Sequence, residues 1–348
     1  MLGNFTFKFA PKPSATKEGL PPTEEGLTEN LEAIWAKERK EGDPEIKVCF
    51  VFGYHYNNLD LTELKKEYAD ADVFIPESAG AGDIGEKLYQ NVSAGIWSVD
   101  ELEKKVPYLG DFTFALLRMI YNSKKSVVVA DVPSRHSSVV EQEAIIELSK
   151  KQLAIKSLQE KVSLMKESII RQVAANTERD NFIAQQIPRR LRKLIDGNSK
   201  IRTKASLKVL VFLGIIHTPV FAKMQRSKKP EVSRKFELDG SSFSVFQHTD
   251  ELFRRIMAGQ VADSISAELW EKAVFGSELG HYLLVYYRSE IKKISGKKLI
   301  DIVRKIPESF TRDDIRTVYN SVEKGENFML AFLGVCKSKN IDVSGLFN

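Results

Sequence analysis

The fold is decided by the stretch VCFVFGYH (residues 48–55), an apolar run that ends in a glycine and a histidine. A second run, VLVFLGIIH (residues 209–217), ends in the same way. Short runs of β-branched and aromatic residues are typical of strands that are buried on both faces of a parallel sheet. We therefore interpret both runs as parallel strands that end in a Gly-x-x-His motif, shortened by one residue in the first run.

The rest of the chain places further strands and helices around these two runs. Helical periodicity between apolar runs gives an alternating β–α pattern, which implies parallel strands joined by right-handed crossovers. We expect an α/β fold, with a mixed, largely parallel sheet flanked by helices and a C-terminal helical extension. The pattern predicts strands over 46–52, 72–76, 126–130 and 207–213, a helix over 28–40, a long helix over 139–196 interrupted at Pro188, and a hairpin over 235–245.

Composition divides the chain into three parts. Residues 1–24 are rich in Pro, Lys, Thr and Gly, and we expect them to form a flexible N-terminal arm. Residues 25–230 hold the strand and helix pattern, so we expect them to form the α/β domain. Residues 231–348 are expected to form a hairpin and a helical extension, whose aromatic residues offer a surface for a homo-oligomer or a core of its own.

Composition also limits the class of protein. Hydrophobic residues make up 43% of the 348 positions, which is enough for a sizeable core. The formal net charge of +5 is small, so it gives no support for nucleic acid as a partner. Cys49 and Cys336 lie in apolar surroundings and are expected to be free thiols of a reducing compartment. Because we find no signal peptide and no apolar run long enough for a transmembrane segment, we expect a cytoplasmic protein.

Four polar residues are the candidates for a functional site. His55 and His217 follow equivalent strands, and imidazole is both the commonest metal ligand and an acid or base near neutral pH. Glu77 ends the strand over 72–76, so we expect it at the same edge of the sheet, where open α/β folds bind ligands. Arg179 lies in a helical Glu-Arg-Asp run, and an inward guanidinium suits a carboxylate or an oxyanion. For each residue the alternative is an ordinary structural role.

The order of five motifs resembles that of the TraB/PrgY/Tiki family, part of the superfamily that includes the erythromycin esterase and ChaN folds. Besides the two histidine motifs, these are the strand end FIPES that holds Glu77, the Asp-x-Pro of VVADVP (residues 128–133) and the helical run ERDNFIA (residues 178–184). The resemblance covers roughly residues 46–225, so the N-terminal arm and the helical extension lie outside it.

The resemblance implies a pocket formed by His55, Glu77, Arg179 and His217. Tiki-like members are described as metal-dependent proteases that use the two histidines. We therefore expect a metal-dependent, peptidase-like hydrolase that acts on a peptide or another small ligand, with a divalent metal ion held by His55, His217 and Glu77. Glu77 would be a ligand or the base, and Arg179 would orient a substrate carbonyl or carboxylate. The alternative is a regulatory protein that binds a peptide or haem without catalysis.

Two further patterns favour other functions. GAGDIG (residues 80–85) matches the Gly-x-Gly-x-x-Gly dinucleotide fingerprint, but it starts several residues beyond the second strand, as an ordinary loop over the pocket also would. The basic run RRLRK (residues 189–193) would suit nucleic acid or an anionic membrane surface. Because Leu191 and Leu194 recur there at helical spacing, we favour a solvated amphipathic helix.

Overall fold

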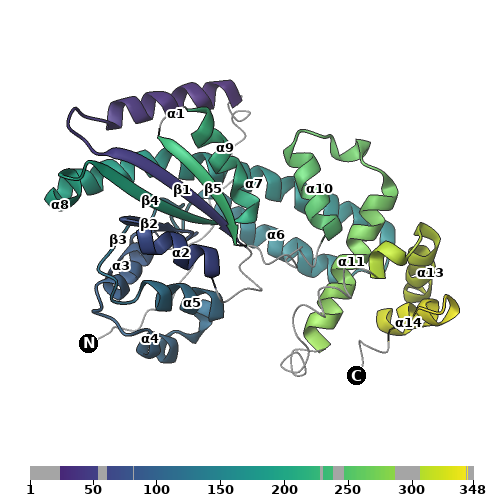
Figure 1. Ribbon diagram of the computed structural model, residues 1–348. Coiled ribbons are helices and arrows are strands. Elements are labelled where there is room, and N and C mark those ends of the chain that lie inside the picture. Colours follow the sequence, from purple (N-terminus) through teal and green to yellow (C-terminus); the bar gives the residue numbers. More distant parts are fainter. Residues whose placement is uncertain are drawn as a thin grey trace.

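The computed structural model describes residues 24–53, 61–80, 82–227, 230–237, 247–286, 306–341 and 343. Within this part of the chain a five-stranded sheet has only parallel pairings and carries helices on both faces (Figure 1). The expected α/β fold with a helical extension is therefore confirmed. Most of the predicted N-terminal arm, residues 1–23, lies outside the described residues. None of the described helices is both long enough and apolar enough to cross a bilayer.

The sheet has the strand order β3-β2-β4-β1-β5, so β1 and β4, which precede the two histidine motifs, are neighbours. Their last residues, Gly53 and Gly214, are partners in the parallel register. Both strands are buried on both faces toward their carboxyl ends, as expected for a sheet covered by helices. The strands are β1 (Glu45–Gly53), β2 (Val73–Pro76), β3 (Ser126–Val127), β4 (Ser206–Gly214) and β5 (Glu231–Glu237).

Alternate strand residues point into two hydrophobic cores, because successive side chains of a strand face opposite sides of the sheet. Phe50 and Phe52 share one core with Leu191, beneath α1 (Glu24–Glu38), α7 (Leu158–Gly197) and α9 (Thr218–Arg226). Val51 shares the other core with Phe114. The helices on that second face are α2 (Thr62–Asp70), α3 (Gly82–Ser93), α4 (Val99–Lys105) and α5 (Gly110–Ile120), with a 3-10 turn at Pro107–Leu109.

The 40-residue helix α7 belongs to both parts of the molecule. Its carboxyl half packs on the sheet, whereas its amino half contributes Met165 and Ile169 to a third core in the helical extension. Figure 1 shows α7 running from the sheet into that extension, with α6 (Ser137–Ala154) beside it. The other helices are α8 (Ser199–Arg202), α10 (Gln247–Met257), α11 (Ala267–Tyr286), α13 (Arg312–Glu323) and α14 (Phe328–Ser338), with 3-10 turns at Ile215–His217 and Ala262–Ser264.

The interruption predicted at Pro188 is wrong. Pro188 lies inside α7, and the helical segment breaks earlier, at residues 155–157 between α6 and α7. Proline removes one backbone N–H from the helical hydrogen bonds and favours a kink. Here the neighbouring Ile187 and Leu191 are fully buried against the sheet, so packing holds the helix in place across the proline.

The segment expected to begin a hairpin is a strand of the main sheet. β5 pairs in parallel with β1, so the sheet includes residues 231–237, which we had assigned to the extension. The second arm of the expected hairpin, over 238–246, lies outside the described residues. The Asp-Gly turn signal is local, whereas the pairing of β5 with β1 joins segments far apart in the chain, and local signals do not report such pairings.

A buried ion pair fixes the helical extension to α7. Lys161 Nζ donates to Glu278 Oε2 of α11 at 2.9 Å and to the carbonyl oxygen of Gln152 at 2.9 Å. The Tyr319 hydroxyl of α13 donates to the same Glu278 oxygen at 2.6 Å. Burial and the Glu278 carboxylate raise the pKa of Tyr319 well above its ordinary value, so the hydroxyl stays a donor.

Candidate functional site

The candidate site lies at the carboxyl edge of the sheet, where β2, β3 and β4 end. Because Gly53 and Gly214 are partners in register, the two histidine motifs leave the sheet from neighbouring positions. His217 follows β4 in a 3-10 turn and is fully buried. His55 lies outside the described residues, and its meeting with His217 over one pocket stays a prediction.

Arg179 of α7 is the centre of the cluster. Its guanidinium binds Asp131 bidentately, from Nε to Oδ1 at 2.9 Å and from Nη2 to Oδ2 at 2.6 Å. The same Nη2 donates to Glu77 Oε1 at 2.8 Å, and Nη1 lies 2.9 Å from His217 Nε2. Three of the four predicted site residues, Glu77, Arg179 and His217, are thus in direct contact. Such bidentate, charge-assisted bonds are the geometry for which arginine is best suited.

Asp131 is a site residue that we did not single out from the sequence. It follows β3, in the Asp-x-Pro segment, and is 5% exposed. Its two oxygens also accept backbone N–H groups, from Ser78 at 2.9 Å and from Val132 at 2.7 Å. The available signal was a carboxylate directly after a buried apolar strand, which is the same signal that pointed to Glu77.

Glu77 joins the ends of two strands. It directly follows β2, and its Oε2 accepts the backbone N–H of Gly214 at the end of β4. Its Oε1 faces both Arg179 Nη2 and His217 Nε2, the latter at 3.5 Å. One oxygen of the carboxylate is therefore fixed by the end of β4, and the other faces the arginine and the histidine.

His217 is oriented by Asp180, the second site residue that we had not singled out. Arginine only donates hydrogen bonds, so the contact with Arg179 uses the lone pair on His217 Nε2. Nδ1 then carries the proton and donates a hydrogen bond to Asp180 Oδ1 at 2.5 Å. His217 and Asp180 are both fully buried. A carboxylate on one ring nitrogen fixes the tautomer and the orientation of the imidazole, as it does in hydrolytic sites.

The acidic neighbours favour a second proton on His217. Burial by itself lowers the pKa of this imidazole, but the charge of Glu77 and the hydrogen bond to Asp180 outweigh it and raise the pKa to about 9. A proton on Nε2 would displace Arg179 Nη1 from its 2.9 Å contact and would face Glu77 Oε1 instead. The proton and Arg179 therefore compete for the same nitrogen.

Arg179 keeps one N–H group that has no acceptor among the described residues. A guanidinium has five N–H donors, and four of them are used by Asp131, Glu77 and His217. The remaining N–H is on Nη1. The side chains of Arg179 and Glu77 are 12% and 13% exposed, whereas Asp131 and His217 are almost completely buried. Arg179 and Glu77 are therefore the members of the cluster that a ligand can reach.

The described residues do not by themselves fit a metal centre. Glu77 and His217, which we expected to be ligands, are bridged by the guanidinium of Arg179. The positive charge between these two residues is thus the Arg179 guanidinium. Within the described ranges, no group of three or more His, Cys, Asp or Glu side chains is arranged to hold a metal ion. A metal held with the help of His55 stays a prediction.

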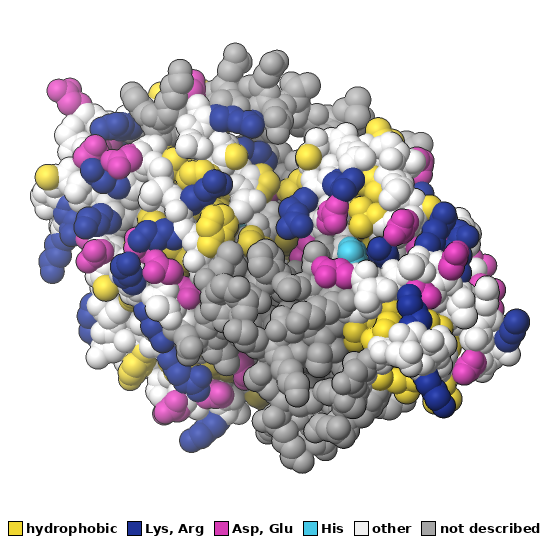
Figure 2. Space-filling model, turned by 45° about the vertical axis from the view of Figure 1, so that its right-hand side comes forward, with side chains coloured by type: hydrophobic (Ala, Val, Ile, Leu, Met, Phe, Trp, Pro, Cys, Tyr) yellow, Lys and Arg dark blue, Asp and Glu magenta, His cyan; other side chains and the backbone are white. Residues whose placement is uncertain are grey.

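The structure gives little support to the dinucleotide-binding and nucleic-acid-binding interpretations. Gly80 of the glycine-rich segment is tied to the strand-end loop, since its N–H donates to the Val132 carbonyl at 3.0 Å. Of the basic residues near the end of α7 and after α8, Arg190 pairs with Glu86 at 3.7 Å and Lys204 pairs with Asp72 at 2.7 Å. On the face shown in Figure 2, basic and acidic side chains are interspersed rather than gathered in one basic patch. This distribution gives no support for a nucleic-acid surface.

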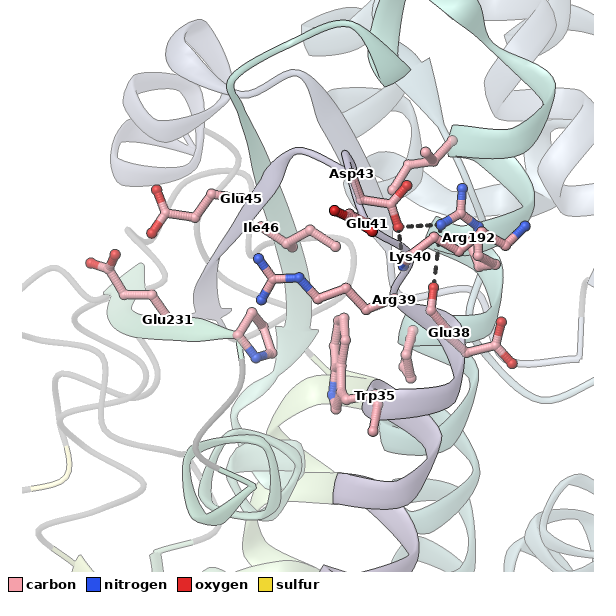
Figure 3. A pocket seen from close by; sticks show the side chains of 14 residues that line it. Trp35, Glu38, Arg39, Lys40, Glu41, Asp43, Glu45, Ile46, Arg192 and Glu231 are labelled. Atoms are coloured by element: carbon pink, nitrogen blue, oxygen red, sulfur yellow. Dashed lines mark hydrogen bonds and ion pairs between the residues drawn. The ribbon is translucent and has the colours of Figure 1, made fainter.

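A cavity of about 600 Å³ lies at the opposite, amino edge of the sheet (Figure 3). Trp35 of α1 and Arg39 just after that helix line it, together with Glu45 and Glu231 at the starts of β1 and β5. It shares no residue with the cluster around Arg179. We place the chemistry at the carboxyl edge, because the buried histidine and its carboxylate partners lie there, whereas the buried Arg192 and Asp43 that line this cavity form an ion pair with each other.

Comparisons with protein-family models, with curated proteins and with solved structures found no match. The resemblance to the TraB/PrgY/Tiki family therefore stays a prediction that rests on the motifs alone.

Proposed function

We propose that the chain is a hydrolase whose reacting centre consists of Glu77, Arg179 and His217. The observation that supports it best is the position of His217, which is held by Asp180 at Nδ1 and turned at Nε2 toward both an arginine and a carboxylate. Buried acid–base groups with such matched partners cluster at functional sites. The substrate class that the family resemblance implies is a peptide.

The chemistry follows from the two protonation states of His217. With Nε2 protonated, Arg179 Nη1 loses its acceptor and turns its N–H groups to the carbonyl oxygen of the substrate. Glu77 takes a proton from the attacking water while the water oxygen bonds to the carbonyl carbon. As the bond to the leaving group breaks, Glu77 gives the proton that it took from the water to that group, because Glu77 faces the ligand whereas His217 is fully buried. Glu77 is then a carboxylate again, and His217 keeps its Nε2 proton throughout, 3.5 Å from Glu77 Oε1.

No step in this scheme passes through a metal ion. We leave the expected divalent metal ion out of the scheme, because Arg179 lies between two of its three expected ligands. The experiment below tests whether a metal ion is needed. Cytoplasmic location likewise stays part of the proposal. Both cysteines are free thiols, and burial raises the pKa of Cys336 to about 11, which makes this thiol unreactive.

The proposal is tested by measuring hydrolysis of a peptide library and of simple esters by the purified, untagged chain. Activity should fall at least about a hundredfold in Glu77→Gln and in His217→Gln, the range that acid–base groups contribute. Glu86→Gln is the matched control, since Glu86 lies in α3 outside the cluster and accepts from the side chain of Gln90 and from the N–H of Val129. Metal analysis and a chelator arm run in parallel. Activity that is abolished by chelator and restored by one metal would replace the metal-free scheme, and no activity in any arm would contradict the hydrolase.

A second candidate is a non-catalytic binding protein. It is favoured by the nearly complete pairing of the cluster, in which four of the five Arg179 donors are used within the chain. Haem is the less suitable ligand for His217, because that imidazole is fully buried and both its nitrogens are engaged. Saturable binding of a peptide without turnover, lost in Arg179→Lys, would favour this candidate, whereas a Soret band on titration with haem would point to His55.

A further inference from the structure

The cavity at the amino edge of the sheet has the size of a binding site for a small organic molecule. Its volume of about 600 Å³ lies within the range of cavities that hold such ligands. Part of its wall is apolar and is formed by Trp35, Ala36, Ile46, Pro188, Ile195 and Pro230. A ligand with an apolar group therefore finds a surface against which that group can be buried.

Trp35 turns ring carbons, and not its N–H, toward this cavity. The residue lines the cavity and is 6% exposed, whereas its Nε1 is closed to water. A ligand that reaches Trp35 from the cavity thus meets an aromatic hydrocarbon surface. Because aromatic rings pack favourably on one another, this surface favours a ligand that itself carries an aromatic ring.

Most charged groups of the lining already have a partner of opposite charge. The pairs are Arg192 with Asp43, Lys40 with Asp196, and Lys47, from outside the lining, with both Glu45 and Glu231. The exception among the lining cations is Arg39, for which the described part of the chain provides no acceptor. Arg39 is also exposed, so a ligand can reach its guanidinium.

Arg39 is directed into the cavity. It follows Trp35 by four residues, so the two side chains leave the end of α1 on the same side. Figure 3 shows the Arg39 side chain extended across the cavity, whereas the carboxylate of Glu38 points the opposite way. A guanidinium without a partner offers a planar fork of N–H donors, which fits a carboxylate bidentately. The cavity thus places an anion-binding group beside an aromatic ring.

The acidic residues of the lining favour an anion of a single charge. Glu41 is exposed and has no partner among the described residues, and Glu45 and Glu231 also line the cavity. These carboxylates would repel a phosphate dianion about twice as strongly as a carboxylate at the same position. A carboxylate is therefore the better ligand group for Arg39.

We propose that this cavity binds a small aromatic carboxylate, whose ring packs on Trp35 and whose carboxylate oxygens accept hydrogen bonds from Arg39. The site shares no residue with the cluster around Arg179, and it does not depend on the proposed hydrolase function.

The test compares three probes that share a phenyl ring and differ in charge: 3-phenylpropionate, 3-phenylpropanol and 3-phenylpropylamine. Their binding to the full chain is measured by calorimetry at low ionic strength, where charges are least screened. 3-Phenylpropionate should bind with a Kd of about 1 mM or tighter, the affinity expected of a molecule of this size. The alcohol should bind about tenfold more weakly or worse, because it lacks the charge-assisted hydrogen bonds to Arg39, and the amine should bind more weakly still.

Three variants locate the binding. Arg39→Gln should lower the affinity for 3-phenylpropionate to that for the alcohol and leave the alcohol unaffected. Lys37→Gln is the matched control, since it removes the same charge from an exposed position of α1 that does not line the cavity. Ala36→Trp, at an exposed position of the lining, fills the cavity without changing its charge and should abolish the binding of both probes.

The expected order of the probes, with losses in Arg39→Gln and Ala36→Trp but not in Lys37→Gln, supports the site. Absence of 3-phenylpropionate binding, equal affinities for the carboxylate and the alcohol, or an equal loss in Lys37→Gln overturns it. Unchanged binding in Ala36→Trp also overturns it, since the probe then binds elsewhere. Tighter binding of the amine would overturn it as well and would assign the cavity to a cation held by Glu41.

Discussion

Arg179 Nη1 lies 2.9 Å from His217 Nε2, so a guanidinium nitrogen stands where a metal ion bound to that imidazole would have to lie. A metal ion sits about 2.0–2.1 Å from a histidine nitrogen, along the direction of its lone pair. The present position of Arg179 and a metal ion on Nε2 therefore exclude each other. The cluster is organised around a fixed positive charge, and its chemistry depends on where that charge points.

Removing this charge should destabilise the protein strongly. Arg179→Ala would leave the carboxylates of Asp131 and Glu77 without their cation in a site that is almost closed to water. Breaking one partner of a buried ion pair costs about 3–5 kcal/mol, and we expect a loss of that order in the free energy of unfolding at pH 7, measured with urea. Arg189→Ala, on the exposed side of the same helix, should stay within about 0.5 kcal/mol of the wild type. Equal losses in the two variants would show that Arg179 has no special role.

Asp180 should control both the proton and the activity of His217. Asp180→Asn removes a negative charge and a hydrogen bond that raise the pKa of His217, so that pKa should fall well below about 9. The amide also allows the opposite tautomer, which would turn the Nε2 proton toward Arg179. We expect a fall in hydrolysis of about a hundredfold or more, with the tautomer change visible in ¹⁵N NMR. An unchanged His217 titration would contradict the assigned contact.

His217 also predicts how stability depends on pH. Its pKa is raised in the folded state to about 9, from the ordinary value of 6.5. The stabilising contribution is therefore fully present below about pH 6.5, where both states hold the proton, and is lost as the pH rises through about 9. Relative to His217→Gln, the wild type should lose about 3 kcal/mol of unfolding free energy over this window. A difference between the two proteins that stays constant from pH 6 to pH 10 would rule this out.

The sequence predicted those site residues that directly follow an apolar strand. Glu77 and His217 follow apolar strands, so the parallel sheet had to bring them to one edge. Asp180 is next to Arg179 in the chain, yet its role depends on the rotation of α7 against the sheet, which the composition of the run Glu-Arg-Asp does not specify. The place of β5 beside β1 could not be predicted from the sequence either, because it depends on pairing between distant segments. The nearby Asp-Gly turn signal is local and predicted a hairpin instead.

The ion pair between Lys161 and Glu278 provides a test of how the helical extension is held. Both side chains are almost fully buried, and Glu278 also accepts the hydroxyl of Tyr319. Lys161→Met should cost about 3–5 kcal/mol of unfolding free energy, because it leaves a buried carboxylate without its cation. Lys161→Met combined with Glu278→Gln should recover part of this loss, since no buried charge then remains unpaired. Lys166→Met is the control, because Lys166 lies on the same helix and pairs with the exposed Asp263. If the double variant is no more stable than Lys161→Met, the two charges are not coupled and packing alone holds the extension to α7.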